Sequence, residues 1–212
     1  KTTKTTIPFV KNNNFDYRWL VSWTGKYADI AVWIVFILVV ILIVTAVSNS
    51  ANLTDGLDGL AAGVSSISSL SLFFISILRT DVNISIVIYT SIITIALAGA
   101  TLGFLPFNFN PAKIFMAESG AAFLGFTLSV ISIQGTLKSY ATISIAIPLL
   151  VLGVPLFDTI FAILRRLINR RPIMEADRGH LHHRLIDMGL SHKQSVVMIY
   201  TVSAALGLCA IV

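Results

Sequence analysis

The chain has 212 residues, of which 56% are hydrophobic and only 12% carry a charged side chain. An ordinary soluble domain has about 25% charged residues, so this composition excludes that class and predicts an integral membrane protein. The formal net charge of +5 suits a membrane surface or a phosphate ligand, and no nucleic-acid-binding motif accompanies it. The single cysteine, Cys209, excludes a disulfide within the chain.

The first element in the chain is a predicted short hairpin. Turn-forming asparagines at 12–14 separate the extended-type segments 7–10 and 15–17. The aromatic residues that follow, including Trp19 and Trp23, are typical of a membrane–water interface. A plain linker over residues 1–29 fits the same pattern, and both interpretations are kept.

Six apolar runs follow, and most of them reach the ~20 residues that a bilayer-spanning helix needs. They lie at 30–48, 60–78, 84–105, 121–137, 143–164 and 196–212. We therefore predict an all-α, polytopic membrane helix bundle with about six transmembrane helices in one membrane domain, residues 1–212. The run 121–137 is marginal because it contains polar residues and glycine. The alternative, a soluble helical protein, is disfavoured because six such runs exceed what one core can bury.

Chain direction reverses at each span, so the parity of the helices predicts which polar segments share a face. If all six runs cross, the segments 49–59, 106–120 and 165–195 lie together, and these hold nearly all residues able to do chemistry. The arginine cluster after residue 164 identifies this face as cytoplasmic by the positive-inside rule. The N-terminal hairpin is then expected on the periplasmic side.

The segment Asn52 to Gly59 places two carboxylates, Asp55 and Asp58, directly after the first apolar run. Oxygen ligands at this density suit a hard cation such as Mg²⁺, which accepts one or two carboxylates plus substrate phosphates. Gly56 and Gly59 allow a sharp turn and a close approach of the backbone to a ligand. The segment predicts a site where a metal-bound phosphate meets the bilayer.

The second candidate segment is 107–120, whose only charged residues are Lys113 and Glu118. Glu118 could add an oxygen ligand to a metal, and Lys113 could face a phosphate. The alternative is that both side chains are simply solvated, as most charged side chains in loops are.

The third candidate segment, 177–184, holds three histidines and two arginines. Arginine offers a planar fork for phosphate, and histidine donates or moves protons near neutral pH. Zinc is the rival ligand of a histidine cluster, although no cysteine lies near to complete four ligands. A solvated basic loop is the third alternative, and phosphate binding is the favoured interpretation.

Asp158 lies inside an apolar run, where an ionisable side chain is functional by default or paired within the bundle. It precedes Arg165 by about two helical turns, which places it near the rim of the membrane. The pattern leaves a structural pairing and a catalytic role open.

These three segments, in this order, resemble three cytoplasmic motifs of the polyprenyl-phosphate N-acetylhexosamine-1-phosphate transferases. They read Asn-Leu-Thr-Asp-Gly-Leu-Asp-Gly at 52–59, the loop at 107–120, and Gly-His-Leu-His-His-Arg at 179–184. The resemblance implies a Mg²⁺-dependent phosphoglycosyltransferase of the glycosyltransferase 4 type. Such an enzyme transfers a sugar-1-phosphate from a UDP-sugar to undecaprenyl phosphate and releases UMP. Its expected location is the bacterial inner (plasma) membrane, as a multi-pass protein with a cytoplasmic active face.

The resemblance also implies a role for each matching residue. The expected catalytic residues are Asp55, Asp58, His182 and His183; the expected substrate-binding residues are Asn52, Lys113, His180 and Arg184; and the expected Mg²⁺ ligands are Asp55 and Glu118. Expected partners are undecaprenyl phosphate, a UDP-N-acetylhexosamine, the lipid bilayer and a second copy in a homodimer, with no nucleic acid.

The two ends of the chain resemble different branches of this family. Residues 7–63 resemble the MraY branch, which uses UDP-MurNAc-pentapeptide, whereas residues from about 104 resemble the TagO/WecA branch, which uses UDP-GlcNAc. The form His-Leu-His-His-Arg at 180–184 is of the GlcNAc type, so we favour UDP-GlcNAc. Lipid I synthesis, a non-catalytic scaffold and a transporter fragment remain as alternatives, and a mosaic or designed sequence would also explain the mixture.

The chain departs from the family pattern at two points. Family members carry an Asp-Asp pair on an earlier helix, and the resemblance therefore predicts that this chain is the C-terminal part of a longer transferase and inactive alone. The family loop usually reads Met-Gly-Asp-Thr/Val-Gly, where this chain has Met-Ala-Glu-Ser-Gly at 116–120. Glu118 keeps the charge of the aspartate but adds a methylene, which matters because Mg²⁺ tolerates displaced ligands poorly.

Overall fold

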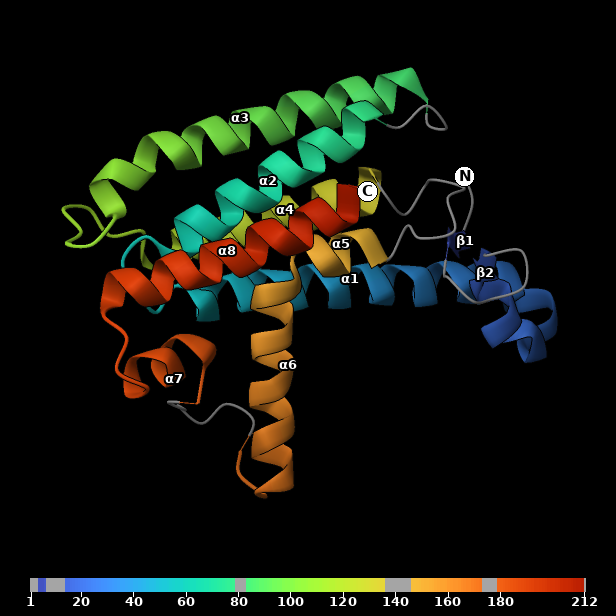
Figure 1. Cartoon of the computed structure of the whole chain (residues 1–212). Helices are drawn as coiled ribbons and strands as arrows, with labels where there is room; N and C mark the ends of the chain where they lie inside the picture. Colours follow the sequence, from blue (N-terminus) through green and yellow to red (C-terminus); the bar gives the residue numbers. More distant parts are fainter. Residues whose placement is uncertain (1–3, 7–13, 79–82, 136–145, 173–178, 212) are drawn as a thin grey trace.

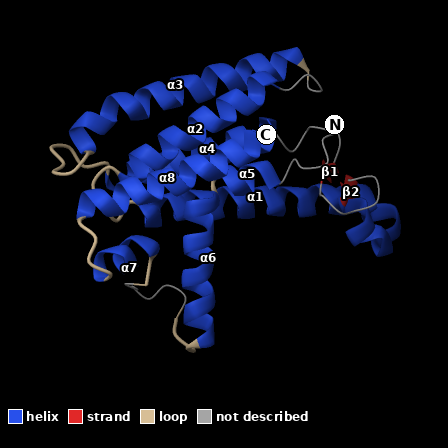
Figure 2. Ribbon diagram, in the orientation of Figure 1, coloured by secondary structure: helices blue, strands red, loops and turns tan. Residues whose placement is uncertain are grey.

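The structure, a computed structural model, describes residues 4–6, 14–78, 83–135, 146–172 and 179–211, and these are almost entirely helical (Figure 2). The elements are β1 (Lys4–Thr6), β2 (Asn14–Asp16), the 3-10 helix η2 (Tyr17–Tyr27), α1 (Ala28–Thr54), α2 (Leu60–Leu78), α3 (Ile84–Asn108), α4 (Ala117–Gly135), α5 (Ala146–Val151), α6 (Gly153–Ile168), α7 (Leu181–Asp187) and α8 (His192–Ile211). The all-α fold class is confirmed.

Four helical segments among the described residues are long and apolar enough to cross a membrane: 17–54, α2, α3 and α8. The apolar run expected at 143–164 is divided at Leu152 between α5 and α6. Figure 1 shows α6 leaving the bundle across the direction of the other long helices. The total of about six transmembrane helices therefore stays a prediction.

The helix α2 lies at the centre of the bundle because its side chains are small. In the most apolar stretch of α2, 72% of the residues are buried. The corresponding share is 28% in α3 and in α8, which pack on either side of α2. Six serines between Ser65 and Ser76 occupy its buried faces. The hydroxyls of Ser66 and Thr101 are 2.8 Å apart, and Ser68 donates to the carbonyl oxygen of Val151 at 3.0 Å. Small residues and hydroxyl contacts are how membrane helices pack closely without a hydrophobic driving force.

Two glycines allow neighbouring helices to approach closely. A Cβ on Gly125 of α4 would lie 2.7 Å from the Cα of Ser48 on α1. A Cβ on Gly63 of α2 would overlap the ring of Tyr200 on α8, whose hydroxyl donates to the carbonyl oxygen of Gly59 at 2.5 Å. These contacts fix α1 against α4 and α2 against α8.

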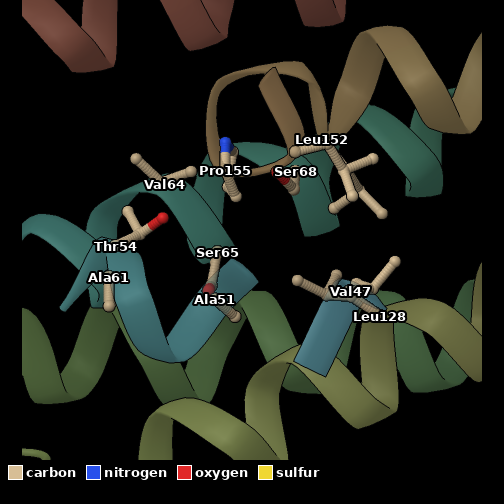
Figure 3. A pocket seen from close by; sticks show the side chains of 11 residues that line it. Val47, Ala51, Thr54, Ala61, Val64, Ser65, Ser68, Leu128, Leu152 and Pro155 are labelled. Carbon is tan, nitrogen blue, oxygen red and sulfur yellow. The ribbon is translucent and has the colours of Figure 1, made fainter. Parts of the chain in front are cut away.

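One small cavity lies in the interior of the bundle. A cavity of about 10 Å³ lies where α1, α2, α4 and the α5–α6 junction meet, lined mainly by apolar side chains such as Val47, Leu128 and Leu152 (Figure 3). This volume is about that needed for one water molecule. A substrate must therefore bind at another place.

The N-terminal hairpin is confirmed as an antiparallel pair in which Lys4 lies opposite Asp16. The first strand is Lys4–Thr6; residues 7–10, where we predicted it, lie outside the described part of the chain. The following helix η2 exposes Trp19 (73%) and Trp23 (84%) at the start of α1. This exposure agrees with the predicted aromatic anchor at one membrane–water interface.

The ends of several helices gather at the opposite end of the bundle, on the left in Figure 1. They are the C-terminal ends of α1 and α3, the N-terminal ends of α2, α4 and α8, and the whole of α7. Asp58 bonds to the 110–112 segment, and the ring of His182 packs against Gly56, so the predicted shared face is confirmed for these segments. Residues 173–178 lie outside the described chain, and α6 leaves the bundle, with the side chain of Arg165 reaching Gly179 beside α7.

Candidate functional site

A cleft of about 870 Å³ opens between α1, α4, α6 and α7 at this end of the bundle. One part of its wall is polar and belongs to the three motif segments and their neighbours. The other part is apolar and is formed by α1 and α6, with Leu42, Ala46, Leu156, Ile160 and Ile163. The cleft therefore runs from a charged region into an apolar groove between two helices.

The polar wall begins where α1 ends. The last turn of the helix closes with Asp55 donating its N–H to the carbonyl oxygen of Asn52 at 3.1 Å. Gly56 follows, and a Cβ at this position would overlap the imidazole of His182. The absence of a side chain at Gly56 thus lets the third motif pack directly on the first.

Asp55 lines the cleft and carries an unfavourable negative charge. Burial raises the pKa of its carboxyl group above the ordinary value, and the nearby negative charge of Asp58 raises it further. A cation or a proton at this position would relieve both effects. The electrostatics of Asp55 therefore suit a cation-binding role.

Asp58 does not line the cleft but joins two of the motif segments. Its Oδ2 accepts a hydrogen bond from the side-chain amide of Asn110 at 3.0 Å and from the backbone N–H of Ala112 at 3.1 Å. These bonds tie the 52–59 segment to the loop before α4. The structure thus gives Asp58 a contact within the scaffold, and its expected catalytic role stays a prediction.

The histidines of the third motif lie together in the cleft wall. The rings of His180 and His182 are stacked with centroids 5.9 Å apart, and His183 lies 4.3 Å from His182. His182 is only 3% exposed, and burial, together with the neighbouring His183, lowers its pKa to about 4. The ring of His182 is therefore neutral at pH 7, and it can donate one N–H to a phosphate.

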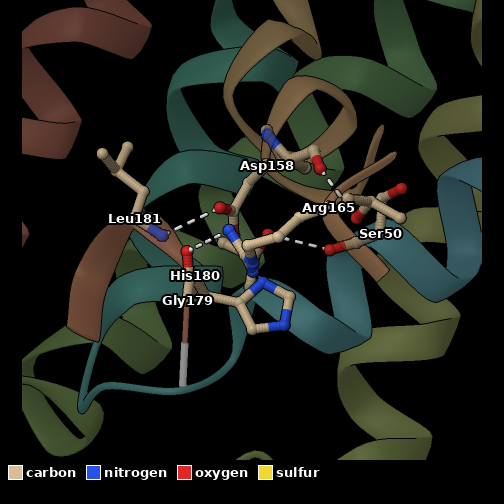
Figure 4. Close-up of polar contacts among 9 residues, drawn as sticks. Ser50, Asp158, Arg165, Gly179, His180 and Leu181 are labelled. Atoms are coloured by element: carbon tan, nitrogen blue, oxygen red, sulfur yellow. Dashed lines mark hydrogen bonds and ion pairs between the residues drawn. The ribbon is translucent and has the colours of Figure 1, made fainter. Parts of the chain in front are cut away.

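Asp158 pairs with this motif, so the structural pairing that the sequence left open is present. Its Oδ2 is 2.9 Å from Nδ1 of His180, and its Oδ1 accepts the backbone N–H of Leu181 at 2.8 Å (Figure 4). Arg165, on the same helix, donates to the carbonyl oxygen of Gly179 at 3.0 Å. The helix α6 therefore holds the start of α7 in place.

Six of the predicted site residues line the cleft, namely Asn52, Asp55, Glu118, His180, His182 and His183. Three others do not: Asp58, Lys113 and Arg184. Lys113 and Arg184 are exposed to solvent.

Sequence reasoning missed five polar residues of the cleft wall: Thr45, Asn49, Ser50, Thr159 and Arg166. Asn49 lies three residues before Asn52, on the same face of α1, so helical spacing could have identified it. For Arg166 no signal was available, because adjacent arginines at 165 and 166 point to different sides of a helix.

The residues of the cleft fit Mg²⁺ better than zinc. Among the described residues, no group of three histidine, cysteine or acidic side chains is placed to hold a metal ion. Zinc requires three or four such protein ligands. Mg²⁺ is commonly bound by one or two carboxylates plus water and substrate phosphates, which Asp55 and Glu118 in one cleft wall can provide.

These features define a multi-pass membrane protein with a ligand cleft at one end of its helix bundle. The family-level match agrees with them. Residues 14–136, more than half of the chain, match the model of glycosyl transferase family 4, and the chain belongs to this family. The histidine motif and α6 lie beyond the matched residues.

The similar proteins are transferases named for polyprenyl phosphates or for phospho-N-acetylmuramoyl-pentapeptide. The chain is 48% identical over 120 residues (57% of the chain, 34% of the relative) to a probable undecaprenyl-phosphate N-acetylglucosaminyl 1-phosphate transferase of Bacillus subtilis. It is 39% identical over 121 residues (52% and 30%) to the decaprenyl-phosphate N-acetylglucosaminephosphotransferase of Mycobacterium leprae. It is 46% identical over 146 residues (63% and 34%) to the phospho-N-acetylmuramoyl-pentapeptide-transferase of Parabacteroides distasonis. The alignments span about a third of the length of these curated relatives.

Proposed function

We propose that this protein takes part in the transfer of N-acetylglucosamine-1-phosphate from UDP-GlcNAc to undecaprenyl phosphate, with release of UMP. The observation that carries the proposal is the division of one cleft into a charged part and an apolar part. A polyprenyl phosphate has the same division. Its phosphate suits the region of Asp55 and the histidines, and its isoprenoid chain suits the groove between α1 and α6.

The residues of the charged part have separate tasks in this reaction. Bound Mg²⁺ would neutralise the diphosphate of the UDP-sugar. Asp55 and Glu118 are the side chains that would hold the cation, and Asn52 lies beside Asp55 to orient the ligands. His182 and His183 line the cleft as donors to phosphate oxygens, and His180 lines it beside them. An oxygen of the lipid phosphate attacks the β-phosphorus, and the bond between the two phosphates breaks with UMP as the leaving group. Catalysis then rests on positioning and on stabilising charge.

The choice of sugar rests on the third motif and on the similar proteins. The His-Leu-His-His-Arg sequence at 180–184 is of the GlcNAc type, and two of the relatives above are named for GlcNAc-1-phosphate transfer. The alternative donor is UDP-MurNAc-pentapeptide, and it is supported by the resemblance of residues 7–63 and by the Parabacteroides relative.

The proposed location is the bacterial inner membrane, with the cleft open to the cytoplasm. Support comes from the arginines at 165, 166, 170 and 171, which lie beyond the apolar part of α6. Positively charged residues next to membrane segments are retained on the cytoplasmic side.

A transfer assay on the complete protein in lipid bilayers tests the proposal. We expect radiolabelled product lipid from UDP-GlcNAc and undecaprenyl phosphate, and none from UDP-MurNAc-pentapeptide. Product from the pentapeptide donor alone would overturn the assignment of the sugar, and no product from either donor would overturn the enzymatic function.

Matched variants then test the site. Asp55→Asn should abolish transfer, whereas Asp187→Asn, an exposed aspartate outside the cleft, should leave it unchanged. Glu118→Gln should raise the Mg²⁺ concentration needed for half-maximal rate, because a lost charge weakens a hard-cation site. Glu118→Asp should lower that concentration if the extra methylene holds the carboxylate out of place. Equal Mg²⁺ dependence in all three forms at position 118 would remove Glu118 from the metal site.

A further inference from the structure

The helix α6 binds three consecutive residues at the start of the third motif. Asp158 receives hydrogen bonds from the ring of His180 and from the backbone N–H of Leu181, and Arg165 donates to the carbonyl oxygen of Gly179 (Figure 4). The guanidinium of Arg165 occupies the place where a Cβ of residue 179 would lie, so a glycine at this position makes room for the contact. No residue of the matched family region takes part in these contacts.

The two side chains of α6 act from one face of the helix. Asp158 and Arg165 are seven residues apart, which is about two turns, so they project in nearly the same direction. Other residues of α6, among them Ile160 and Ile163, line the apolar part of the cleft. One helix therefore forms part of the groove and also holds the motif that lines its charged end.

The pairing determines which nitrogen of His180 faces the cleft. The contact is almost withdrawn from solvent, because the side chains of His180 and Asp158 are 7% and 13% exposed. A carboxylate only accepts hydrogen bonds, so Nδ1 of His180 must carry the proton in this pair. Nε2 is then the nitrogen left for a ligand in the cleft. A second group that fixes the tautomer and orientation of a histidine in this way commonly has a large effect on its function.

We propose that Asp158 is a positioning residue of this site, which holds His180 with the proton on Nδ1 and so presents the unprotonated Nε2 to the cleft as a hydrogen-bond acceptor for the substrate. The role of Nε2 as an acceptor toward the substrate rests on the proposed function. The tautomer does not, because the hydrogen bonds that set it involve no ligand.

Nitrogen-15 NMR of the complete protein in lipid bilayers, labelled at histidine, measures the tautomer directly. The His180 signals are assigned as those lost in His180→Gln. At pH 8 we expect the proton of His180 on Nδ1 in the wild type. In Asp158→Asn the amide oxygen still accepts the Leu181 N–H, so its NH₂ group faces Nδ1 and the proton moves to Nε2. Asp158→Glu keeps an acceptor and should keep the proton on Nδ1. An unchanged tautomer in folded Asp158→Asn would overturn the proposal.

Transfer kinetics give the second measurement and separate this proposal from the proposed function. Asp158→Asn should lower kcat/KM by about tenfold or more, with Asp158→Glu recovering part of the loss and Asp187→Asn at the wild-type value. Rates of Asp158→Asn within twofold of the wild type would overturn the positioning role. If the wild type shows no transfer, the proposed function fails, while the tautomer measurement still decides whether Asp158 sets the state of His180.

Discussion

The two hydrogen bonds of Asp58 allow a quantitative test of what this carboxylate does. Asp58→Ala removes the acceptor of the bonds from Asn110 and Ala112, at 3.0 and 3.1 Å. Hydrogen bonds to a charged group contribute about 1.5–3 kcal/mol each. Both Asp58 and Asn110 are partly accessible to water, which can replace part of the loss. We therefore expect the free energy of unfolding to fall by about 2–4 kcal/mol, near the lower part of the summed range.

A double-mutant cycle separates this effect from a general loss of packing. Unfolding is followed in mixed micelles for the wild type, Asp58→Ala, Asn110→Ala and the double variant. The coupling energy should be about 1–2 kcal/mol, because the two side chains are in direct contact. Asp58→Asn keeps an acceptor oxygen and should lose less than half as much stability as Asp58→Ala.

Two results would refute this reasoning. Additivity of Asp58→Ala and Asn110→Ala would mean that the bond seen in the structure contributes nothing measurable. Normal stability of Asp58→Asn with complete loss of transfer would mean that the charge of Asp58 acts on the reacting groups, as the family resemblance implies, and not through the scaffold.

Three further predictions concern packing, orientation and pH. Gly63→Ala should lower the unfolding midpoint markedly, because the new methyl group overlaps an aromatic ring of α8. The control Gly103→Ala places its methyl group where no atom lies within 4 Å, so it should leave the midpoint unchanged. Equal midpoints for the two variants would contradict the packing of α2 on α8. Two cysteine variants, made in a background without the native cysteine, test the orientation. Ser119→Cys should react with an impermeant thiol reagent only after cell lysis, whereas Ser22→Cys should react in intact cells. Labelling of both from outside would contradict the proposed orientation. The pKa of His182 is about 4 in the folded protein, whereas the ordinary pKa of histidine is 6.5. The unfolded chain therefore binds a proton first as pH falls, so stability should decrease from about pH 6.5 toward pH 4. Thermal unfolding of His182→Gln should show a shallower decrease over this range, and an identical decrease would exclude His182 as the cause.

Much of the architecture could be predicted because membrane helices leave a strong local signal. The long apolar runs at 30–48, 60–78 and 84–105 correspond to α1, α2 and α3, since a spanning helix must satisfy its backbone internally and needs about 20 apolar residues. The alternating direction of the helices was enough to predict that the segments around Asp55 and Glu118 share one face, and both residues line the same cleft. The direction of α6 could not be predicted, because an apolar run has the same composition whether it crosses the bilayer or leaves the bundle.

The types of residue in the site were determined by the sequence, but their partners were decided by the tertiary structure. Asp55 and Asp58 are three residues apart in one motif, yet one lines the cleft and the other bonds to Asn110, because the turn after α1 points them in different directions. Asp158 could be paired or catalytic by its position in the chain, and it pairs with His180, 22 residues away, only because the fold brings the start of α7 against α6. Hydrogen bonds of this kind depend on distances of about 3 Å between atoms that are remote in sequence. Local patterns therefore identify which groups can do chemistry, and packing decides which of them face the substrate.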